Sequence, residues 1–397
     1  MDNFILKVIN RESFLFRNEI KIYGEKMSEI IEKSNFLVIG AAGSIGREVA
    51  KLLFSYKPKK LHIVDISENN LAELVRDIRS EYGYISGEFR ALTLDVSSEE
   101  YDSFIKSDGV YDYVLNLSAL KHVRSEKDPY TLMRLVRVNI LNTIKTINQS
   151  IDSKVKKYFC VSTDKASNPV NLMGASKLIM EMFLSNYSHK IDISSARFAN
   201  VAFSDGSLLD SFDKRIKKKQ PIVAPKEIER YFITPEESGI LCVMSCLFGL
   251  TREIFYPKIQ GDFRLIKLSE VAERYLQLIG LNPLICSSEE EARGKIKSIK
   301  NTNDWPLFLS DSDTTGEKGF EEFYTHSEKI NNDKFENIGI ISNSKGSNIK
   351  LLEEFQFNIS CLLKSNSWSK EHIVKEFMKV IPDLNYQDKG KYLDEKM

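Results

Sequence analysis

The chain has 397 residues, of which 42% are hydrophobic and 28% are charged, and its 56 basic residues balance its 56 acidic residues. This length exceeds one minimal domain, and the apolar share is sufficient for a globular core. Because the formal net charge is zero, electrostatics give no reason to expect nucleic acid or a membrane surface as a partner.

The cysteines and the apolar segments narrow the class of protein further. The five cysteines show neither a paired C-x-x-C motif nor zinc spacing, so we predict free thiols and no metal site. The N-terminus is charged from Asp2 onward and lacks the apolar region of a signal peptide. The most apolar stretch, residues 239–250, is shorter than the ~18 residues that span a bilayer. We therefore expect a soluble, cytoplasmic protein without a membrane span.

Strands and helices are predicted to alternate from residue 35 onward, after an N-terminal extension (1–34) that is expected to form one or two short helices. Continuous apolar runs predict buried parallel strands, and the segments between them have helical periodicity. The predicted strands are residues 36–40, 60–65, 88–96, 111–119, 156–162 and 191–201. This alternation is typical of α/β proteins, so we predict a Rossmann-type, doubly wound parallel sheet over residues 35–200.

Beyond residue 200 the alternation loosens, and the pattern indicates a smaller, mostly helical substrate-binding lobe (201–330), with some strands returning to the main sheet. The polar stretch 287–304 is expected to be a surface excursion. The remaining residues (331–397) are predicted to form a C-terminal helical segment. The predicted helices of these two regions are residues 207–223, 234–250, 268–281 and 369–381.

A glycine pattern, "GAAGSIG", places Gly40, Gly43 and Gly46 between a predicted strand and a predicted helix. The first glycine permits a tight turn, the second lets backbone N–H groups approach a pyrophosphate, and the third permits close packing of the helix against the strand. The N-terminus of the helix adds positive potential for the phosphates. In this context the pattern predicts a dinucleotide site.

Acidic residues at the ends of the next two strands extend this site. Asp65 could accept hydrogen bonds from the adenosine ribose, which favours NAD. Arg47 and Ser67 could accommodate a 2′-phosphate, so NADP stays open. Asp95 and Val96 end the third predicted strand, where a carboxylate and a backbone N–H could meet the adenine.

Four segments together resemble one protein family. They are the glycine pattern, "SALKHV" (118–123), "STDKASNPVNLMGASK" (162–177) and "RFANVAFSDGSL" (197–208). They resemble the UDP-N-acetylglucosamine 4,6-dehydratases of bacterial polysaccharide and nonulosonic acid biosynthesis, within the extended short-chain dehydrogenase/reductase superfamily. The resemblance covers about residues 35–266 and reappears at 314–323 and 381–397. Larger members carry a transmembrane region, so the resemblance is to a short soluble form.

The chain departs from the family pattern at three places. Ser118 stands where the family often has alanine, and Ala199 stands where glycine is usual. Both leave the predicted fold unchanged. Residues 314–318 lack the arginine and proline that often precede the Gly-Glu-Lys, which weakens the predicted substrate contacts there.

The resemblance implies a reaction in three steps: oxidation at C4 of the sugar, loss of water across C5 and C6, and hydride return. Lys165 would be the base at C5, Asp164 the acid for the C6 hydroxyl, and Thr163 a hydrogen-bond partner of the C4 oxygen. Lys177 would bind the nicotinamide ribose. The NAD(P) would be tightly bound and recycled, and its predicted contacts are Gly40, Gly43, Ser44, Ile45, Gly46, Asp65, Ser67, Asp95, Val96, Ser118, Ala119 and Lys177.

Met173 occupies the position of the superfamily's usual acid–base tyrosine, as it does in several members of the family. Because a thioether can neither accept nor give a proton, Asp164 or a water must take the C4 hydroxyl proton. Asn139 is expected to hold backbone and water near the site, and Arg197 lies in a segment that usually lines the nucleotide-sugar cleft. The predicted contacts with the UDP-sugar substrate are Lys121, His122, Met173, Asn200, Ser207, Arg230 for the diphosphate and Glu317 for the uridine ribose.

Two other functions fit the same scaffold. A UDP-sugar 4-epimerase would use a transient ketone without needing Asp164 and Lys165, and a non-catalytic dinucleotide sensor would explain the missing tyrosine. The retained Thr-Asp-Lys triplet favours the dehydratase over both. A homo-oligomer is expected, whereas the choice of NAD or NADP, the C5 configuration, and a 4-ketone or 5,6-ene product stay open.

Overall fold

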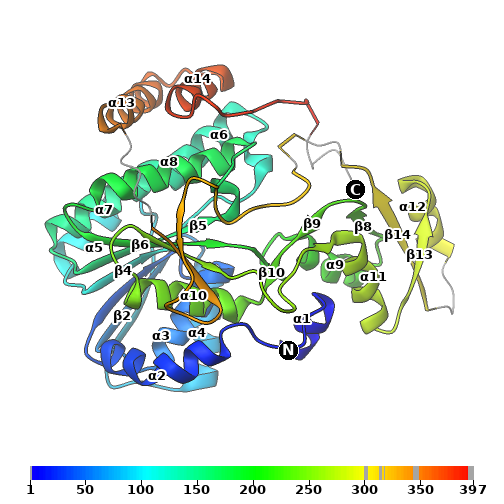
Figure 1. Cartoon of the computed structure of the whole chain (residues 1–397), viewed down its shortest axis with the longest axis horizontal. Helices are drawn as coiled ribbons and strands as arrows, with labels where there is room; N and C mark the ends of the chain where they lie inside the picture. The colour runs from blue at the N-terminus through cyan, green and yellow to red at the C-terminus, as the bar shows by residue number, and fades with distance from the viewer. Residues whose placement is uncertain (1, 299–302, 313–314, 317, 343–347, 392–397) are drawn as a thin grey trace.

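A computed structural model describes residues 2–298, 303–312, 315–316, 318–342 and 348–391. This part of the chain forms a central nine-stranded sheet in the order β15–β16–β11–β6–β5–β4–β1–β2–β3 (Figure 1). In this order the strands from β11 to β3 run parallel, and β16 pairs antiparallel with both β11 and the edge strand β15. The strands are β1 (Asn35–Ile39), β2 (Lys60–Asp65), β3 (Glu88–Thr93), β4 (Tyr113–Asn116), β5 (Lys157–Thr163), β6 (Asp192–Phe198), β11 (Glu253–Pro257), β15 (Lys329–Asn331) and β16 (Ile338–Ser342).

The strand order β3–β2–β1–β4–β5–β6 is that of a doubly wound dinucleotide-binding sheet, which confirms the predicted fold class. Strands β1 and β5 are almost entirely buried, as expected for parallel strands that have helices on both faces. One layer of helices consists of α2 (Arg17–Glu32), α3 (Ser44–Ser55), α4 (Glu68–Tyr82) and α10 (Pro235–Phe248), and the other consists of α5 (Glu99–Asp108), α6 (Pro129–Val136), α7 (Asn142–Asp152) and α8 (Leu172–Tyr187) (Figure 1).

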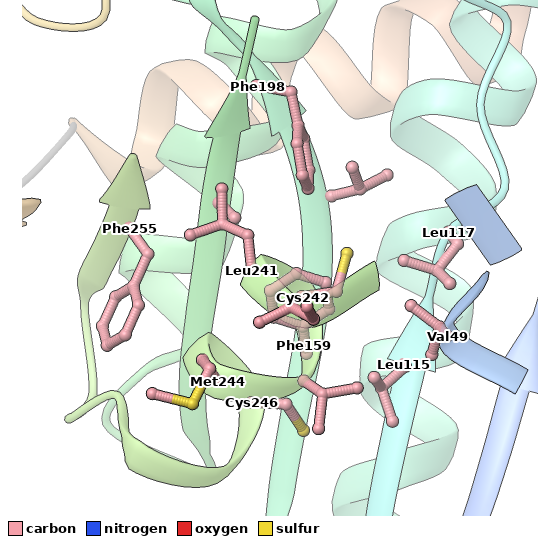
Figure 2. Packing of buried hydrophobic residues seen from close by; sticks show 14 of the residues in the cluster. Val49, Leu115, Leu117, Phe159, Phe198, Leu241, Cys242, Met244, Cys246 and Phe255 are labelled. Atoms are coloured by element: carbon pink, nitrogen blue, oxygen red, sulfur yellow. The ribbon is translucent and has the colours of Figure 1, made fainter. Parts of the chain in front are cut away.

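Helix α10 shows how the core is built. Thr234 caps the helix, with Pro235 in the first turn and Glu237 completing a capping box. Its apolar residues pack against side chains of β4, β5, β6 and β11 (Figure 2). Cys242 and Cys246 are buried free thiols on this helix, as predicted.

The smaller lobe contains a second sheet that the sequence pattern did not predict. Its strands β13 (Asn282–Cys286), β14 (Asp304–Ser310) and β8 (Ile222–Pro225) are parallel and pack with α9 (Leu208–Lys217) and α11 (Leu268–Leu278). The helix expected at 207–223 therefore ends at Lys217, because the apolar run of β8 pairs with a strand more than 80 residues away. The expected surface excursion contains α12 (Glu289–Ser298), which carries exposed ion pairs.

The N-terminal extension forms two helices, as expected, and they contact different parts of the molecule. Helix α1 (Asp2–Val8) packs on α11 of the lobe, where Phe4 meets Tyr275 edge to face. Helix α2 packs on the main core through Met27 and Ile31. Between them, Arg11 forms a buried ion pair with Glu237 at the start of α10.

The C-terminal residues are only partly helical. Helices α13 (Ile349–Ser365) and α14 (Lys370–Val380) pack beside α6 and α8, and α14 corresponds to the helix predicted at 369–381 (Figure 1). However, residues 338–342 form β16, because the apolar run "IGII" pairs with β11, the last of the parallel strands on that side of the sheet. Within the described residues, every helix is too short or too polar to cross a membrane.

Candidate active site

The predicted site residues follow the carboxyl ends of neighbouring parallel strands. The glycine loop from Gly40 follows β1, Asp65 ends β2, Asp95 follows β3, Ser118 follows β4 and Thr163 ends β5. Doubly wound sheets bind their ligands along this edge, where the strand order reverses between β1 and β4.

The glycine loop is packed too closely for side chains at two positions. Gly40 has a φ of +75°, and a Cβ there would lie 2.6 Å from the backbone nitrogen of Ser118. A Cβ on Gly46 would lie 2.1 Å from the carbonyl oxygen of Gly40. Gly43 caps the N-terminus of α3, and the adjacent Ser44 accepts a hydrogen bond from the backbone of the 204–207 loop. This cradle fits a pyrophosphate against a helix N-terminus.

Asp65 is held at the mouth of this loop by two backbone hydrogen bonds. Its Oδ2 accepts from the N–H of Ala42 at 2.9 Å, and its Oδ1 accepts from the N–H of Ser67 at 2.9 Å. Each carboxylate oxygen has a further lone pair for a ribose hydroxyl. Ser67 caps α4 by accepting from the N–H of Asn70. These contacts orient Asp65, and its role toward the ribose stays a prediction.

A cavity of about 350 Å³ lies beside the glycine loop. It is suited in position and size to the adenosine half of a dinucleotide, and the cradle and cavity together fit NAD(P). Leu363 and Trp368 of the C-terminal segment also line it, which the sequence pattern did not predict; Trp368 Nε1 donates to the carbonyl of Pro129 at 2.9 Å. The predicted cofactor residues that line this cavity are Gly40, Asp65, Asp95, Val96, Ser118 and Ala119.

The Thr-Asp-Lys triplet forms a compact turn where β5 passes into the short helix η3 (Asp164–Ala166). Oδ1 of Asp164 accepts from Thr163 Oγ1 at 2.8 Å and from the backbone N–H of Lys165 at 2.9 Å. The Nζ of Lys165 lies 3.2 Å from the same oxygen. Asp164 is buried and Lys165 is half-buried, so a candidate acid and a candidate base meet in a largely desolvated place.

Helix α8 supplies Lys177 and Met173. Lys177 is buried, its Nζ donates to the carbonyl of Val161 at 3.0 Å, and burial lowers the pKa of its ammonium. Met173 is 2% exposed, and its backbone N–H donates to Oε1 of Glu126 at 2.8 Å. Burial raises the pKa of Glu126 to about 7.

Asn139 lies in η2 (Arg137–Leu141), a π-helical turn between α6 and α7, and such turns are frequent at functional sites. Its Oδ1 accepts from the N–H of Leu120 at 2.9 Å, and its Nδ2 donates to the carbonyl of Leu120 at 3.0 Å and to Ser176 at 2.9 Å. Asn139 therefore fixes the loop after β4 against α8, consistent with its expected role in holding backbone.

The predicted substrate residues on the loop after β4 face the 204–207 loop. Nζ of Lys121 donates to Ser204 Oγ at 3.2 Å. The ring of His122 lies against Gly206, where a Cβ would be 3.1 Å from it. Ser207 caps α9, and Asn200 lies in β7 (Asn200–Val201). Their contacts with substrate stay predictions, and Glu317 lies outside the described residues.

The two arginines have different environments. Arg230, in β9 (Glu229–Arg230), donates to the backbone carbonyls of Glu229, Lys318 and Gly319, so its diphosphate role stays a prediction. The expectation that Arg197 lines the cleft is wrong, because its side chain is 1% exposed and pairs with the buried carboxylate of Glu181 and the half-buried carboxylate of Glu328.

One ionisable residue near the triplet was missed by sequence reasoning. Glu321 is 5% exposed, and the charge of Asp164 acts on it strongly enough, after burial, to raise the pKa of its carboxyl. The sequence offers only a weak indication of this residue. Glu321 is one of two adjacent acids between Phe320 and Phe323, in the segment 314–323 where the family resemblance reappears. Only the folded chain shows which acid turns inward.

This geometry defines a Rossmann-type, doubly wound fold with a glycine loop of the kind that short-chain dehydrogenases/reductases have. Residues 36–343 match the family model described as polysaccharide biosynthesis protein, and the chain belongs to this family. The predicted family resemblance is thereby confirmed.

Individual relatives agree with this assignment. The chain is 31% identical over 278 residues to an uncharacterized membrane protein of Methanocaldococcus jannaschii, covering 65% of this chain and 80% of that protein. It is 30% identical over 254 residues to the UDP-N-acetylglucosamine 4,6-dehydratase (inverting) of Campylobacter jejuni, covering 61% and 71%. It is 28% identical over 280 residues to the capsular polysaccharide biosynthesis protein CapD of Staphylococcus aureus, covering 69% of this chain but only 46% of that protein.

A solved structure is also similar. The X-ray structure of Pen from Bacillus thuringiensis superimposes with a TM-score of 0.64 at 25% sequence identity, covering 79% of this chain and 89% of that chain.

Proposed function

We propose that this protein is an NAD(P)-dependent 4,6-dehydratase of a UDP-N-acetylhexosamine, with UDP-N-acetylglucosamine as substrate. The product would be a 4-keto-6-deoxy sugar nucleotide or its 5,6-ene. The observation that carries the proposal is the contact of Asp164 with Lys165, 3.2 Å apart at the carboxyl end of β5. An elimination across C5 and C6 needs an acid and a base near these two carbons, whereas a 4-epimerase needs acid–base help only at the C4 oxygen. The Campylobacter jejuni relative supports the substrate class.

The glycine loop and the adjoining cavity would hold the pyrophosphate and adenosine of NAD(P), with NAD favoured by Asp65. Lys177 would hold the nicotinamide ribose, because its buried ammonium has a third donor beyond those directed at the carbonyl of Val161 and at Sδ of Met180. When bound, the nicotinamide supplies the hydride acceptor for C4 and returns the hydride to C6.

Thr163 connects the C4 hydroxyl to Asp164. The Thr163 hydroxyl donates to Oδ1 of Asp164, and its oxygen accepts from the N–H of Lys165 at 3.4 Å, so one lone pair is left to accept from the substrate. A proton leaving the C4 oxygen can therefore pass through Thr163 to Asp164. Met173 cannot take part, since its thioether exchanges no proton.

The elimination would then use both members of the ion pair. The 4-ketone acidifies the C5 proton, which the neutral amine of Lys165 removes. Protonated Asp164 gives its proton to the C6 oxygen, so the C6–O bond breaks and water leaves as the C5–C6 double bond forms. Lys121, His122, Asn200, Ser207, Arg230 and Glu317 are the proposed contacts with the remaining nucleotide sugar.

Exchange in D₂O tests these roles separately. Lys165→Met should abolish C5 exchange, whereas Asp164→Asn should keep some exchange and lose dehydration. Loss of a general acid or base typically costs ~10²- to 10⁴-fold in rate. NMR of UDP-N-acetylglucosamine incubated with each variant follows C5 deuteration and water loss independently.

A matched control is Lys156→Met, at the opposite end of β5, whose side chain is 71% exposed; it should behave as wild type. Unchanged dehydration in both Asp164→Asn and Lys165→Met would refute the assignment. Formation of the C4 epimer would instead identify an epimerase. Dinucleotide binding without any turnover would identify a sensor.

A further inference from the structure

Part of the wall of the cavity beside the glycine loop comes from outside the region that matches the family. The family match ends at residue 343, whereas Leu363 and Trp368 line this cavity. The other described residues around it all lie between residues 39 and 142, in the dinucleotide-binding part of the sheet and its helices. We propose that Trp368 binds the adenine base of the dinucleotide by stacking, an inference that rests on the NAD(P) site of the proposed function.

The indole of Trp368 is fixed by contacts with the start of α6. Trp368 lies in the linker 366–369 between α13 and α14, and its Nε1 donates to the carbonyl of Pro129 at 2.9 Å. The centroid of its ring lies 6.2 Å from that of Tyr130, at an interplanar angle of 67°. Because the N–H group is already directed at Pro129, the indole has its apolar π surface left for a ligand. A flat purine base suits this surface.

The two helices on either side of this linker are anchored to the helical layer of the sheet. Phe355 of α13 and Phe377 of α14 meet edge to face, with ring centroids 5.7 Å apart, in the core cluster shared with α6 and α8 (Figure 1). Asn366 ends α13 in the left-handed conformation, with a φ of +52°, and Ser369 caps α14. The linker therefore presents Trp368 on a rigid support, so little conformational freedom is lost when a ligand binds.

The course of the cavity brings the base toward this indole. Gly40 of the pyrophosphate cradle and Asp65, the predicted ribose partner, line the same cavity as Trp368. The adenine of a dinucleotide held at these two points would occupy the rest of this cavity. Among the described residues that line it, Tyr130 and Trp368 carry aromatic rings, but Tyr130 is 72% exposed whereas Trp368 is half-buried. Aromatic side chains stack on the faces of nucleobases, and the half-buried indole can exclude more water from that contact.

Tryptophan fluorescence tests the contact directly, because the chain has two tryptophans. Trp305 lies in β14 of the smaller lobe, where its Nε1 donates to the carbonyl of Gln220, and it does not line the cavity. Trp305→Phe therefore leaves Trp368 as the one emitting indole. In protein freed of bound nucleotide, ADP-ribose should quench this emission, whereas nicotinamide mononucleotide, which lacks adenine, should not.

Isothermal titration calorimetry with ADP-ribose measures how much the ring contributes. Trp368→Leu should raise the Kd for ADP-ribose roughly 5- to 150-fold, the range for the loss of one base–aromatic stack. Trp368→Phe keeps an aromatic ring and should restore most of the affinity. Phe357→Leu is the matched control, because Phe357 is 67% exposed on α13 and does not line the cavity; its replacement should leave the Kd unchanged.

Three results would overturn the inference. ADP-ribose could bind without quenching Trp368, or its Kd could be equal in wild type and Trp368→Leu. An equal loss of affinity in Trp368→Leu and Trp368→Phe would show that Trp368 supports the shape of the cavity rather than the base. If Trp368→Leu does not fold, the quenching experiment decides, since the Trp305→Phe protein retains Trp368.

The outcomes also separate the inference from the proposed function. A protein that binds neither NAD, NADP nor ADP-ribose overturns both. Binding that quenches Trp368, without dehydration of UDP-N-acetylglucosamine, overturns the proposed reaction and supports the adenine contact. Normal dehydration with an unquenched Trp368 overturns only the inference.

Discussion

Nη2 of Arg197 lies 2.7 Å from Oε2 of Glu181, and both side chains are at most 2% exposed. The same guanidinium contacts Glu328 and the carbonyl of Phe323, so this pair ties β6 and α8 to the segment that carries Glu321. Its role is therefore in the architecture of the site rather than in binding substrate.

Arg197→Met should strongly destabilise the protein, because it leaves Glu181 as a buried charge without its partner. Breaking a buried pair in this way costs about 3–5 kcal/mol in the free energy of unfolding. Urea denaturation measures the loss. Arg76→Met, which breaks an exposed pair with Glu73, should cost less than ~1 kcal/mol. Equal stability of the two variants would contradict a buried network.

Glu126 should make the stability depend on pH. Its Oε2 is buried without a hydrogen-bond partner among the described residues, and burial raises the pKa of the carboxyl to about 7. Between pH ~4.3 and pH ~7 the unfolded chain ionises this carboxyl before the native protein does, so stability should fall as pH rises. The loss is on the order of 3 kcal/mol and levels off above pH ~7.

Glu126→Gln should remove this part of the pH dependence, because the amide mimics the protonated carboxyl and keeps an acceptor for the N–H of Met173. Thermal or urea unfolding from pH 4 to pH 8 measures the difference from wild type. The exposed variant Glu73→Gln should follow the wild-type curve. Parallel curves for wild type and Glu126→Gln would show that folding does not raise the pKa of Glu126.

Met173→Tyr should change the reaction rate only mildly, since the proposed mechanism assigns the acid–base work to the Thr-Asp-Lys turn. Met173 is 2% exposed, so the larger ring should cost about 1–3 kcal/mol of stability through overpacking. Steady-state dehydration and unfolding are measured together, with Met173→Leu as the control of similar volume. A large gain in rate would mean that the natural protein is a degenerate enzyme.

The cofactor should turn over without net consumption, because in the proposed reaction the hydride removed at C4 returns to C6 within one cycle. Absorbance at the reduced-nicotinamide band should show a small transient and no steady increase while product forms. Steady accumulation of NADH or NADPH would identify a net dehydrogenase instead.

The sequence alone determined the six parallel strands from β1 to β6 and the glycine loop that follows β1, because both depend on local patterns. Buried parallel strands appear in the sequence as continuous apolar runs. Gly40 and Gly46 occupy positions where any side chain would collide with the backbone. The triplet Thr163–Asp164–Lys165 was also visible, since its members are consecutive and their contacts are local.

Only the tertiary structure decided which distant residues join them. Arg197 and Glu321 lie in segments whose local pattern does not show which side chains turn inward, and their burial follows from packing between β6, α8 and the 319–328 loop. Strands such as β8 and β16 are short apolar runs whose partners lie far away in the chain, so their strand state depends on pairing rather than on local preference. The electrostatic coupling of Glu321 to Asp164 is likewise a property of distance in space, which local sequence does not encode.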